Sequence, residues 1–191
     1  MGEMMKPIIV PNRIDLIRLL PRGTIGAEIG VWRGWFSTEI LGCPVKMLYL
    51  IDPWCRQPEG QYQDSINSEN QDTNLAEARA NLSGHRDRCV FIQGFSADVA
   101  RQNTNIPPLD WVYIDGNHSY ANVKEDLELW SKRLKADGVL MGHDYTEGRW
   151  AKEWHMAVVP AVNDFCRDQG WHISHLTDEE LPSFRLERNN A

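Results

Sequence analysis

Several carboxylates and histidines of this sequence stand where a protein can bind a ligand and move a proton. Asp52, Asp115 and Asp144 each follow an apolar run, and His118 and His143 lie within three residues of a carboxylate. A neutral imidazole, with an unperturbed pKa of about 6.5, can accept a proton from a hydroxyl group. A nearby carboxylate can orient that imidazole. These five residues are therefore the first candidates for a functional site.

The apolar runs before these residues are typical of strands, and amphipathic segments lie between them. The expected strands are 24–29, 47–51, 89–93, 109–114 and 139–141, and the expected helices are 13–20, 37–41, 75–82 and one that carries the stripe Val123, Leu127, Trp130, Leu134 and ends at Asp137-Gly138. Strands that alternate with helices favour parallel pairing, because parallel neighbours need long crossover connections. The pattern predicts an α/β fold with a mostly parallel, Rossmann-like doubly wound sheet and helices on both faces.

Two segments depart from this alternation. The polar stretch from Gln57 to Asn74 is expected to be a loop or lid. Near the end of the chain, the β-like runs 171–176 and 183–186 flank a polar stretch that contains Pro182, which is typical of a hairpin. One terminal strand is therefore expected to run antiparallel.

In open parallel sheets, ligands bind beyond the carboxyl ends of the strands, so the residues after each strand are expected to meet. Gly30 and Gly34 follow the first of these strands, and their spacing differs from the GxGxxG pattern that lets the backbone approach a dinucleotide pyrophosphate. Asp52 ends the next strand, where nucleotide-binding folds place the carboxylate for the ribose hydroxyls. Asp52 can also be a turn or capping residue before Pro53.

Two residues near these turns have two interpretations each. Ser96, two residues after Gly94, can contact the edge of an adenine ring or cap the following helix. Trp54 can belong to the core or stack on the adenine. The residue types alone leave both alternatives open.

Taken together, four motifs carry a family resemblance over roughly residues 24–170. They are Glu28-x-Gly30-x-x-x-Gly34, Asp52-Pro53-Trp54, Gly94-Phe95-Ser96 and the segment Tyr113–Tyr120. This combination resembles the class I S-adenosylmethionine-dependent methyltransferases. More narrowly, the segment 115–120, the helix segment 126–130, His143-Asp144-Tyr145 and the later segment 159–165 resemble small-molecule O-methyltransferases related to macrocin O-methyltransferase.

The resemblance implies a sheet of about seven strands with S-adenosylmethionine at its carboxyl edge. Glu28, Gly30 and Gly34 would shape the pocket for the methionine moiety, and Asp52 would hold the ribose. Gly94, Phe95 and Ser96 would line the adenine, together with Trp54 if it stacks, and Asp115 would face the methionine amino group or a metal. The sequence departs from the family pattern at 135–138, where a Pro-Gly-Gly turn is usual.

Some relatives bind a divalent cation after the fourth and fifth strands, and the corresponding residues here are Asp115, His143 and Asp144. An imidazole in place of one carboxylate suits Mn²⁺, Fe²⁺ or Zn²⁺ better than Mg²⁺. Without a metal, His143 or His118 would act as the general base, with His143 favoured because it is expected to end a strand. Asp144 would then orient the base.

The resemblance and the composition define an expected function. We expect methylation of a hydroxyl on a small molecule by one domain over residues 1–191, with an N-terminal helical segment (1–23), a cofactor-binding core (24–170) and a terminal hairpin (171–191). A nicotinamide-dependent oxidoreductase, which the missing third glycine disfavours, and a non-catalytic S-adenosylmethionine-binding module are the alternatives. The formal charge of −7 disfavours a nucleic-acid partner.

The sequence also gives an expected location. It has no run of 18 apolar residues and no signal-peptide core, so we expect a cytoplasmic protein without a membrane partner. A homo-oligomer is compatible with these features.

Overall fold

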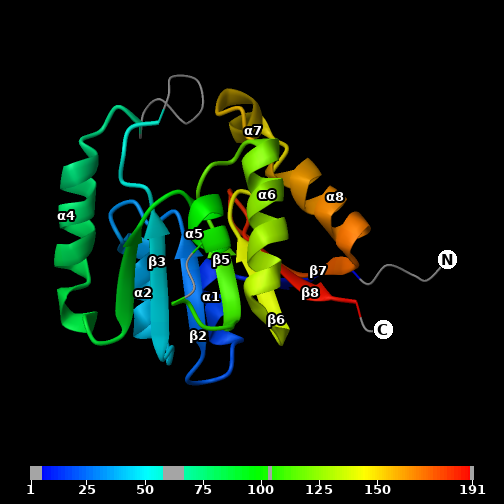
Figure 1. The fold of residues 1–191 in the computed structure, drawn as a ribbon. Coiled ribbons are helices and arrows are strands. Elements are labelled where there is room, and N and C mark those ends of the chain that lie inside the picture. The colour runs from blue at the N-terminus through cyan, green and yellow to red at the C-terminus, as the bar shows by residue number, and fades with distance from the viewer. Residues whose placement is uncertain (1–5, 58–66, 103–104, 190–191) are drawn as a thin grey trace.

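The structure, a computed structural model, describes residues 6–57, 67–102 and 105–189. Its described part forms an eight-stranded sheet in the order β1-β7-β8-β6-β5-β2-β3-β4 (Figure 1). The strands are β1 (Ile8–Val10), β2 (Ile25–Ile29), β3 (Met47–Asp52), β4 (Cys89–Gln93), β5 (Leu109–Ile114), β6 (Leu134–Gly142), β7 (Trp171–Thr177) and β8 (Phe184–Arg188). All neighbouring strands are parallel except β8, which is antiparallel to both β6 and β7.

Helices cover both faces of the sheet. The helices are α1 (Arg13–Arg18), α2 (Trp35–Gly42) and α4 (Gln71–Asn81) on one face, and α5 (Ser96–Gln102), α6 (Tyr120–Trp130) and α8 (Val158–Gln169) on the other. In Figure 1, α5 and α6 lie in front of the sheet. Alternate residues of β5 enter different cores: Val112 packs with α5, α6 and α8, whereas Trp111 and Tyr113 pack with α1 and α2. The short helix α7 (Arg149–Glu153) connects β6 to α8.

The predicted α/β sheet is confirmed, with a correction to its strand count. The sequence predicts about seven strands, whereas the structure has eight, because Ile8–Val10 in the segment predicted to be helical pairs with β7 as β1. Three residues are too few for a period-two pattern to identify a strand. The predicted antiparallel strand is β8, which lies inside the sheet, between β6 and β7.

The predicted end of the helix after β5 is also wrong. The helix α6 ends at Trp130, and Leu134, which the apolar stripe assigns to the helix, begins β6. Arg188 explains this earlier end, because its guanidinium donates hydrogen bonds to the carbonyl oxygens of Ser131 and of residues 135, 136 and 138. These carbonyl groups therefore need no helical partners.

The segment predicted as a loop or lid, Gln57–Asn74, is described only in part. Residues 58–66 lie outside the described residues, and residues 71–74 form the first turn of α4. Within the described residues, no helix is long and apolar enough to cross a membrane.

The register of the parallel strands positions the candidate residues. Ile29 at the end of β2 pairs with Ile51 of β3 and with Ile114 of β5, and Ile114 pairs with Gly142 of β6. These strands therefore end level with one another. The residues that follow them share one edge of the sheet, where the sequence predicts the site.

Candidate active site

A cleft opens at this carboxyl edge, between the strand ends and the helices α5 and α6. The empty space between its walls, including the open solvent at its mouth, is about 850 Å³. Its walls combine apolar and polar side chains. They are formed by Gly30, Trp32, Ile51, Asp52, Pro53, Cys55, Gln57, Asn67, Gln71, Phe95, Ser96, Ala97, Gly116, Asn117, Asn122, Glu125 and Asp126.

The glycine turn after β2 brings the backbone close to the end of β5. Gly30 has φ of +86°, and a Cβ atom built there would lie 2.1 Å from the carbonyl oxygen of Asp115. Only glycine fits this approach. Gly34, with φ of +73°, precedes α2 and packs against Ala78 of α4, so it shapes the turn without lining the cleft.

Asp52 lines the cleft and also holds the glycine turn in place. Its Oδ2 accepts hydrogen bonds from the backbone N–H groups of Val31 and Trp32, both at 2.9 Å, and its Oδ1 accepts one from Trp54 at 2.7 Å. Burial raises the pKa of Asp52, against the effect of these N–H groups. Because a carboxylate has about four acceptor positions, Asp52 retains capacity for a ribose hydroxyl.

The turn after β4 contributes two of its three predicted residues to the cleft. Phe95 is 47% exposed and lines the cleft with Ser96, whereas Gly94 does not border it. The Ser96 hydroxyl donates to Asp126 at 2.6 Å and accepts from the indole N–H of Trp130 at 2.7 Å. The donor hydrogen of that hydroxyl is therefore used within the protein, together with one of its two acceptor positions.

Two residues predicted to contact the cofactor lie away from the cleft. Trp54 is 3% exposed, packs on Phe91 in the core, and donates its indole N–H to the carbonyl oxygen of Trp32. Of its two interpretations, the structure supports the core residue. Glu28 is 2% exposed and accepts a hydrogen bond from Ser37, on the side of the sheet that α2 covers. Neither side chain borders the cleft.

The burial of Glu28 can be tested through the pH dependence of the free energy of unfolding. Burial raises the pKa of Glu28 to about 8, against the opposing hydrogen bond from Ser37. In the unfolded chain the carboxyl group ionises near its ordinary value of about 4.3, so between about pH 4 and pH 8 unfolding releases a proton and the free energy of unfolding falls as pH rises. We expect the Glu28→Gln variant to be more stable than the wild type at pH 8 by about 2–4 kcal/mol, and similar to it at pH 4.

Urea unfolding at pH 4.5, 6 and 8 measures this difference. The control is Glu39→Gln, which removes one carboxylate from the exposed side of α2. Its free energy of unfolding should depend on pH as that of the wild type does. If the stability of Glu28→Gln falls with rising pH as steeply as that of the wild type, the raised pKa of Glu28 is contradicted.

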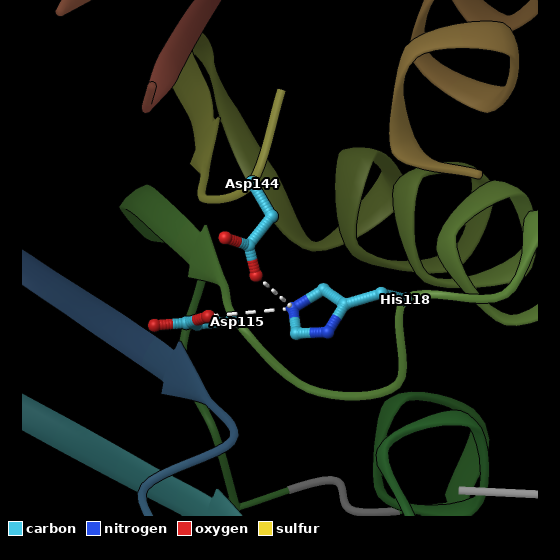
Figure 2. Close-up of side chains that lie close together, drawn as sticks. All are labelled: Asp115, His118 and Asp144. Carbon is cyan, nitrogen blue, oxygen red and sulfur yellow. Dashed lines mark ion pairs between the residues drawn. The ribbon is translucent and has the colours of Figure 1, made fainter. Parts of the chain in front are cut away.

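Beside the cleft, Asp115, His118 and Asp144 converge (Figure 2). Asp115 and His118 belong to the loop after β5, and Asp144 follows β6. His118 Nε2 lies 3.0 Å from Asp144 Oδ2 and 3.5 Å from Asp115 Oδ1. His118 Nε2 and Asp144 Oδ1 are buried, and although each lies within ion-pair distance of another side chain, neither makes a contact with hydrogen-bond geometry among the described residues. Asp144 has φ of +59°, which is uncommon outside glycine.

His143 joins this cluster from the other side. Its Nδ1 lies 3.1 Å from Asp144 Oδ1 and 3.6 Å from Asp115 Oδ1. Burial lowers the pKa of His143, but the two carboxylates have the larger combined effect and raise it. The structure thus brings together all three residues of the predicted metal set, but the ligand atoms that converge belong to His118 with the two aspartates. The Asp-x-x-His spacing, in which the two residues share one loop, is the signal for this assignment.

Arg13 is a residue of this site that the sequence analysis did not identify. Its guanidinium lies 3.6 Å from Asp115 Oδ2 and 4.1 Å from the centre of the Phe36 ring. Burial alone would raise the pKa of Asp115, but the two histidines and Arg13 together lower it. No local motif marks Arg13, because only the packing of α1 brings it to the end of β5.

Comparisons with known proteins give the family. The model of the family described as "Methyltransferase domain" matches residues 27–145, which is more than half of the chain. An uncharacterized protein of Acanthamoeba polyphaga mimivirus is 28% identical over 145 residues, which cover 74% of this chain. The match spans only 58% of that viral protein's own length.

Solved structures share the fold at low identity. The N-methyltransferase NodS of Bradyrhizobium japonicum matches with a TM-score of 0.66 and 11% identity, over 93% of each chain. An O-methyltransferase family protein of Burkholderia thailandensis matches with a TM-score of 0.65 and 15% identity, over 93% of this chain and 55% of that one. An rRNA methylase of Streptococcus thermophilus matches with a TM-score of 0.60 and 14% identity, over 93% and 94%.

These three proteins are described as acting on different kinds of acceptor, so the shared fold does not choose among acceptors. The match to the family model does not depend on the acceptor. It shows that the chain belongs to the methyltransferase-domain family of S-adenosylmethionine-dependent enzymes.

Proposed function

We propose that the chain transfers the methyl group of S-adenosylmethionine to a hydroxyl oxygen of a small molecule, at the cluster of Asp115, His118, His143 and Asp144. The observation that carries this proposal is the position of the cluster. Asp115 directly precedes Gly116 and Asn117, which line the cleft, and its carbonyl oxygen faces Gly30. Acid–base groups therefore lie next to the place where the cofactor would end.

The cleft has the chemical groups that the cofactor needs. Asp52 can accept a ribose hydroxyl, and Phe95 and Ile51 offer apolar surface to the adenine. Gly30 and Gly116, which line the cleft at the ends of β2 and β5, present backbone without side chains to the methionine moiety. A nicotinamide dinucleotide would need a second glycine close to Gly30, and residues 31–33 are Val, Trp and Arg.

The donor set of the cluster also fits a divalent cation. Bonds of about 2.1 Å at right angles or tetrahedral angles separate two ligand atoms by about 3.0–3.4 Å. The distances of 3.0 and 3.5 Å from His118 Nε2 to the two carboxylates lie close to this range. The two buried atoms that lack hydrogen bonds would gain partners from such an ion. We propose that Asp115, His118 and Asp144 hold it, and that Mn²⁺, Fe²⁺ or Zn²⁺ suits them better than Mg²⁺.

Within this proposal, the residues of the cluster have separate tasks. A bound divalent cation would lower the pKa of an acceptor hydroxyl and orient it. His143 is held by the carboxylates at Nδ1, which leaves Nε2 to accept the hydroxyl proton. The acceptor oxygen then forms a bond to the methyl carbon as the carbon–sulfur bond breaks, and the sulfonium becomes neutral S-adenosylhomocysteine. Asp115 and Asp144 stabilise the imidazolium that results.

The proposed acceptor is argued from the charge of the chain and from a pair of aromatic side chains. The formal charge of −7 opposes long polyanions. In the segment that follows Asp144 in the chain, the rings of Trp150 and Trp154 lie 4.7 Å apart, and the Trp150 indole N–H donates to Glu180 at 2.7 Å. Aromatic faces of this kind suit a phenolic ring or the apolar face of a sugar. An RNA acceptor is the competing possibility to be tested.

Calorimetric titration of metal-stripped protein with S-adenosylhomocysteine tests the cofactor, with NAD⁺ as the comparison ligand. We expect micromolar binding of S-adenosylhomocysteine and none of NAD⁺. Radiolabelled S-adenosylmethionine is then offered with phenols, sugars and total RNA, with and without Mn²⁺. Label on a small-molecule hydroxyl, increased by Mn²⁺, is the expected result, whereas label on RNA or on nitrogen would overturn the proposed acceptor.

A further inference from the structure

Asp126 is a buried carboxyl group that the proposed chemistry leaves without a role. It lies on α6, is 5% exposed, and borders the cleft. It shares the inward side of the helix with Val123 and Trp130, which are 2% and 0% exposed. A carboxyl group at such a position costs free energy unless it has a partner.

A chain of hydrogen bonds fixes the orientation of this carboxyl group. The Trp130 indole N–H donates to the Ser96 hydroxyl at 2.7 Å, and that hydroxyl donates to Asp126 Oδ1 at 2.6 Å. Among the described residues, Asp126 Oδ2 has no hydrogen-bond partner, and it is not one of the fully buried unpartnered atoms. Asp126 Oδ2 is therefore an oriented acceptor that remains available at the wall of the cleft.

The surroundings of Asp126 in the cleft suit a flat ring. Ile51, Phe95 and Ala97 give apolar surface, and Asp126 adds an acceptor at the wall. An aromatic ring with an amino group on its edge would bury its faces against the apolar side chains and donate to the carboxyl group. A ring with a carbonyl oxygen at the same place would set one acceptor against another.

We propose that Asp126, rather than Ser96, is the residue that recognises the adenine of the cofactor, by accepting a hydrogen bond from its 6-amino group. This inference rests on the proposed function, since it assumes that S-adenosylmethionine occupies the cleft. In this arrangement, Ser96 and Trp130 are positioning residues that act through Asp126. Burial raises the pKa of Asp126 to about 7, against the hydrogen bond from Ser96, as expected for an acceptor whose donor comes with the ligand.

The test compares two ligands whose purine rings differ at C6 and at the adjoining N1, which is an acceptor in adenine and carries a hydrogen in hypoxanthine. S-Adenosylhomocysteine carries the 6-amino group, and S-inosylhomocysteine carries a 6-oxo group instead. We expect the wild-type protein to bind the adenosyl compound between about 10-fold and 100-fold more tightly, as measured by calorimetry. The Asp126→Asn variant, whose amide can donate to the 6-oxo group, should lose most of this preference.

The control is Glu128→Gln, on the same helix but outside the cleft lining, which should keep the wild-type preference. The comparison of the two ligands on the wild-type protein needs no variant. It therefore tests the recognition of the 6-amino group even if Asp126→Asn fails to fold. Equal affinities of the wild type for the two ligands, or an unchanged preference in a folded Asp126→Asn variant, would overturn the role of Asp126. If neither ligand binds to the wild type, the proposed function is overturned instead.

Discussion

The His118→Ala variant is expected to transfer methyl groups about 10²- to 10⁴-fold more slowly than the wild type, with little change in its affinity for S-adenosylhomocysteine. The imidazole of His118 lies 3.0 Å from Asp144 and 3.5 Å from Asp115, and alanine would leave these two carboxylates without it. The predicted loss is in the reaction step, because His118 does not line the cleft.

Two measurements distinguish this role from a structural one. The first is the affinity of the cofactor-free protein for Mn²⁺, which should fall at least about tenfold in His118→Ala. The second is the melting temperature, which should stay near the wild-type value. His172→Ala is the matched control, because His172 is an imidazole on β7 that hydrogen-bonds to Asn189 at the protein surface. Wild-type turnover and Mn²⁺ affinity in His118→Ala would exclude the proposed centre.

The Gly30→Ala variant is expected to lose more than about 3 kcal/mol of unfolding free energy, together with most of its cofactor affinity. Two effects add at this position. A residue with a Cβ atom is strained at φ of +86°, and the Cβ itself would lie 2.1 Å from the carbonyl oxygen of Asp115. The turn and the end of β5 would have to separate, and both Gly30 and Gly116 line the cleft.

Other glycines of the chain allow these effects to be measured separately. Gly23→Ala introduces a Cβ at φ of +78° with no atom within 4 Å, so it should cost only the backbone strain of about 1 kcal/mol. Gly42→Ala, at the end of α2 in open space and without positive φ, should be neutral or slightly stabilising. Urea unfolding and titration with S-adenosylhomocysteine compare the three variants. Equal losses in Gly30→Ala and Gly23→Ala would show that the contact with Asp115 does not matter.

The central fold could be predicted from the sequence because its strands are short, apolar and separated by clear breakers. The strands β4 and β5 have the predicted bounds, and β3 is longer than predicted by one residue. The strand β1 could not be predicted, since its pairing with β7 joins residues far apart in the chain. The end of α6 depends in the same way on Arg188, which is distant in sequence.

The candidate site could be predicted at the level of strand ends but not of individual contacts. Residues after the parallel strands come together, as expected for Asp52, Asp115 and Asp144. The histidine whose nitrogen approaches the two aspartates is His118, and its position depends on the path of the loop after β5. Hydrophobic periodicity does not predict the path of a loop. Ser96 and Trp54 have their hydrogen bonds within the protein, and those partners come from other elements.

One signal for Asp126 was present in the sequence. The spacing of Val123, Asp126 and Trp130 follows the helical period, so a charged residue lies on the buried side of α6. A charge at such a position is costly and therefore points to a specific partner.

The place of β8 between β6 and β7 determines when the sheet can be completed during synthesis. Ribosomes deliver the chain from its amino end, so β1 and β6 emerge before β7 and β8. Until β8 is available, β6 has an open edge, and β7 and β1 have no connection to the rest of the sheet. The helix α1, which places Arg13 beside Asp115, directly follows β1. In a nascent chain, β1 can therefore join the sheet only after β8 has paired with β6 and β7.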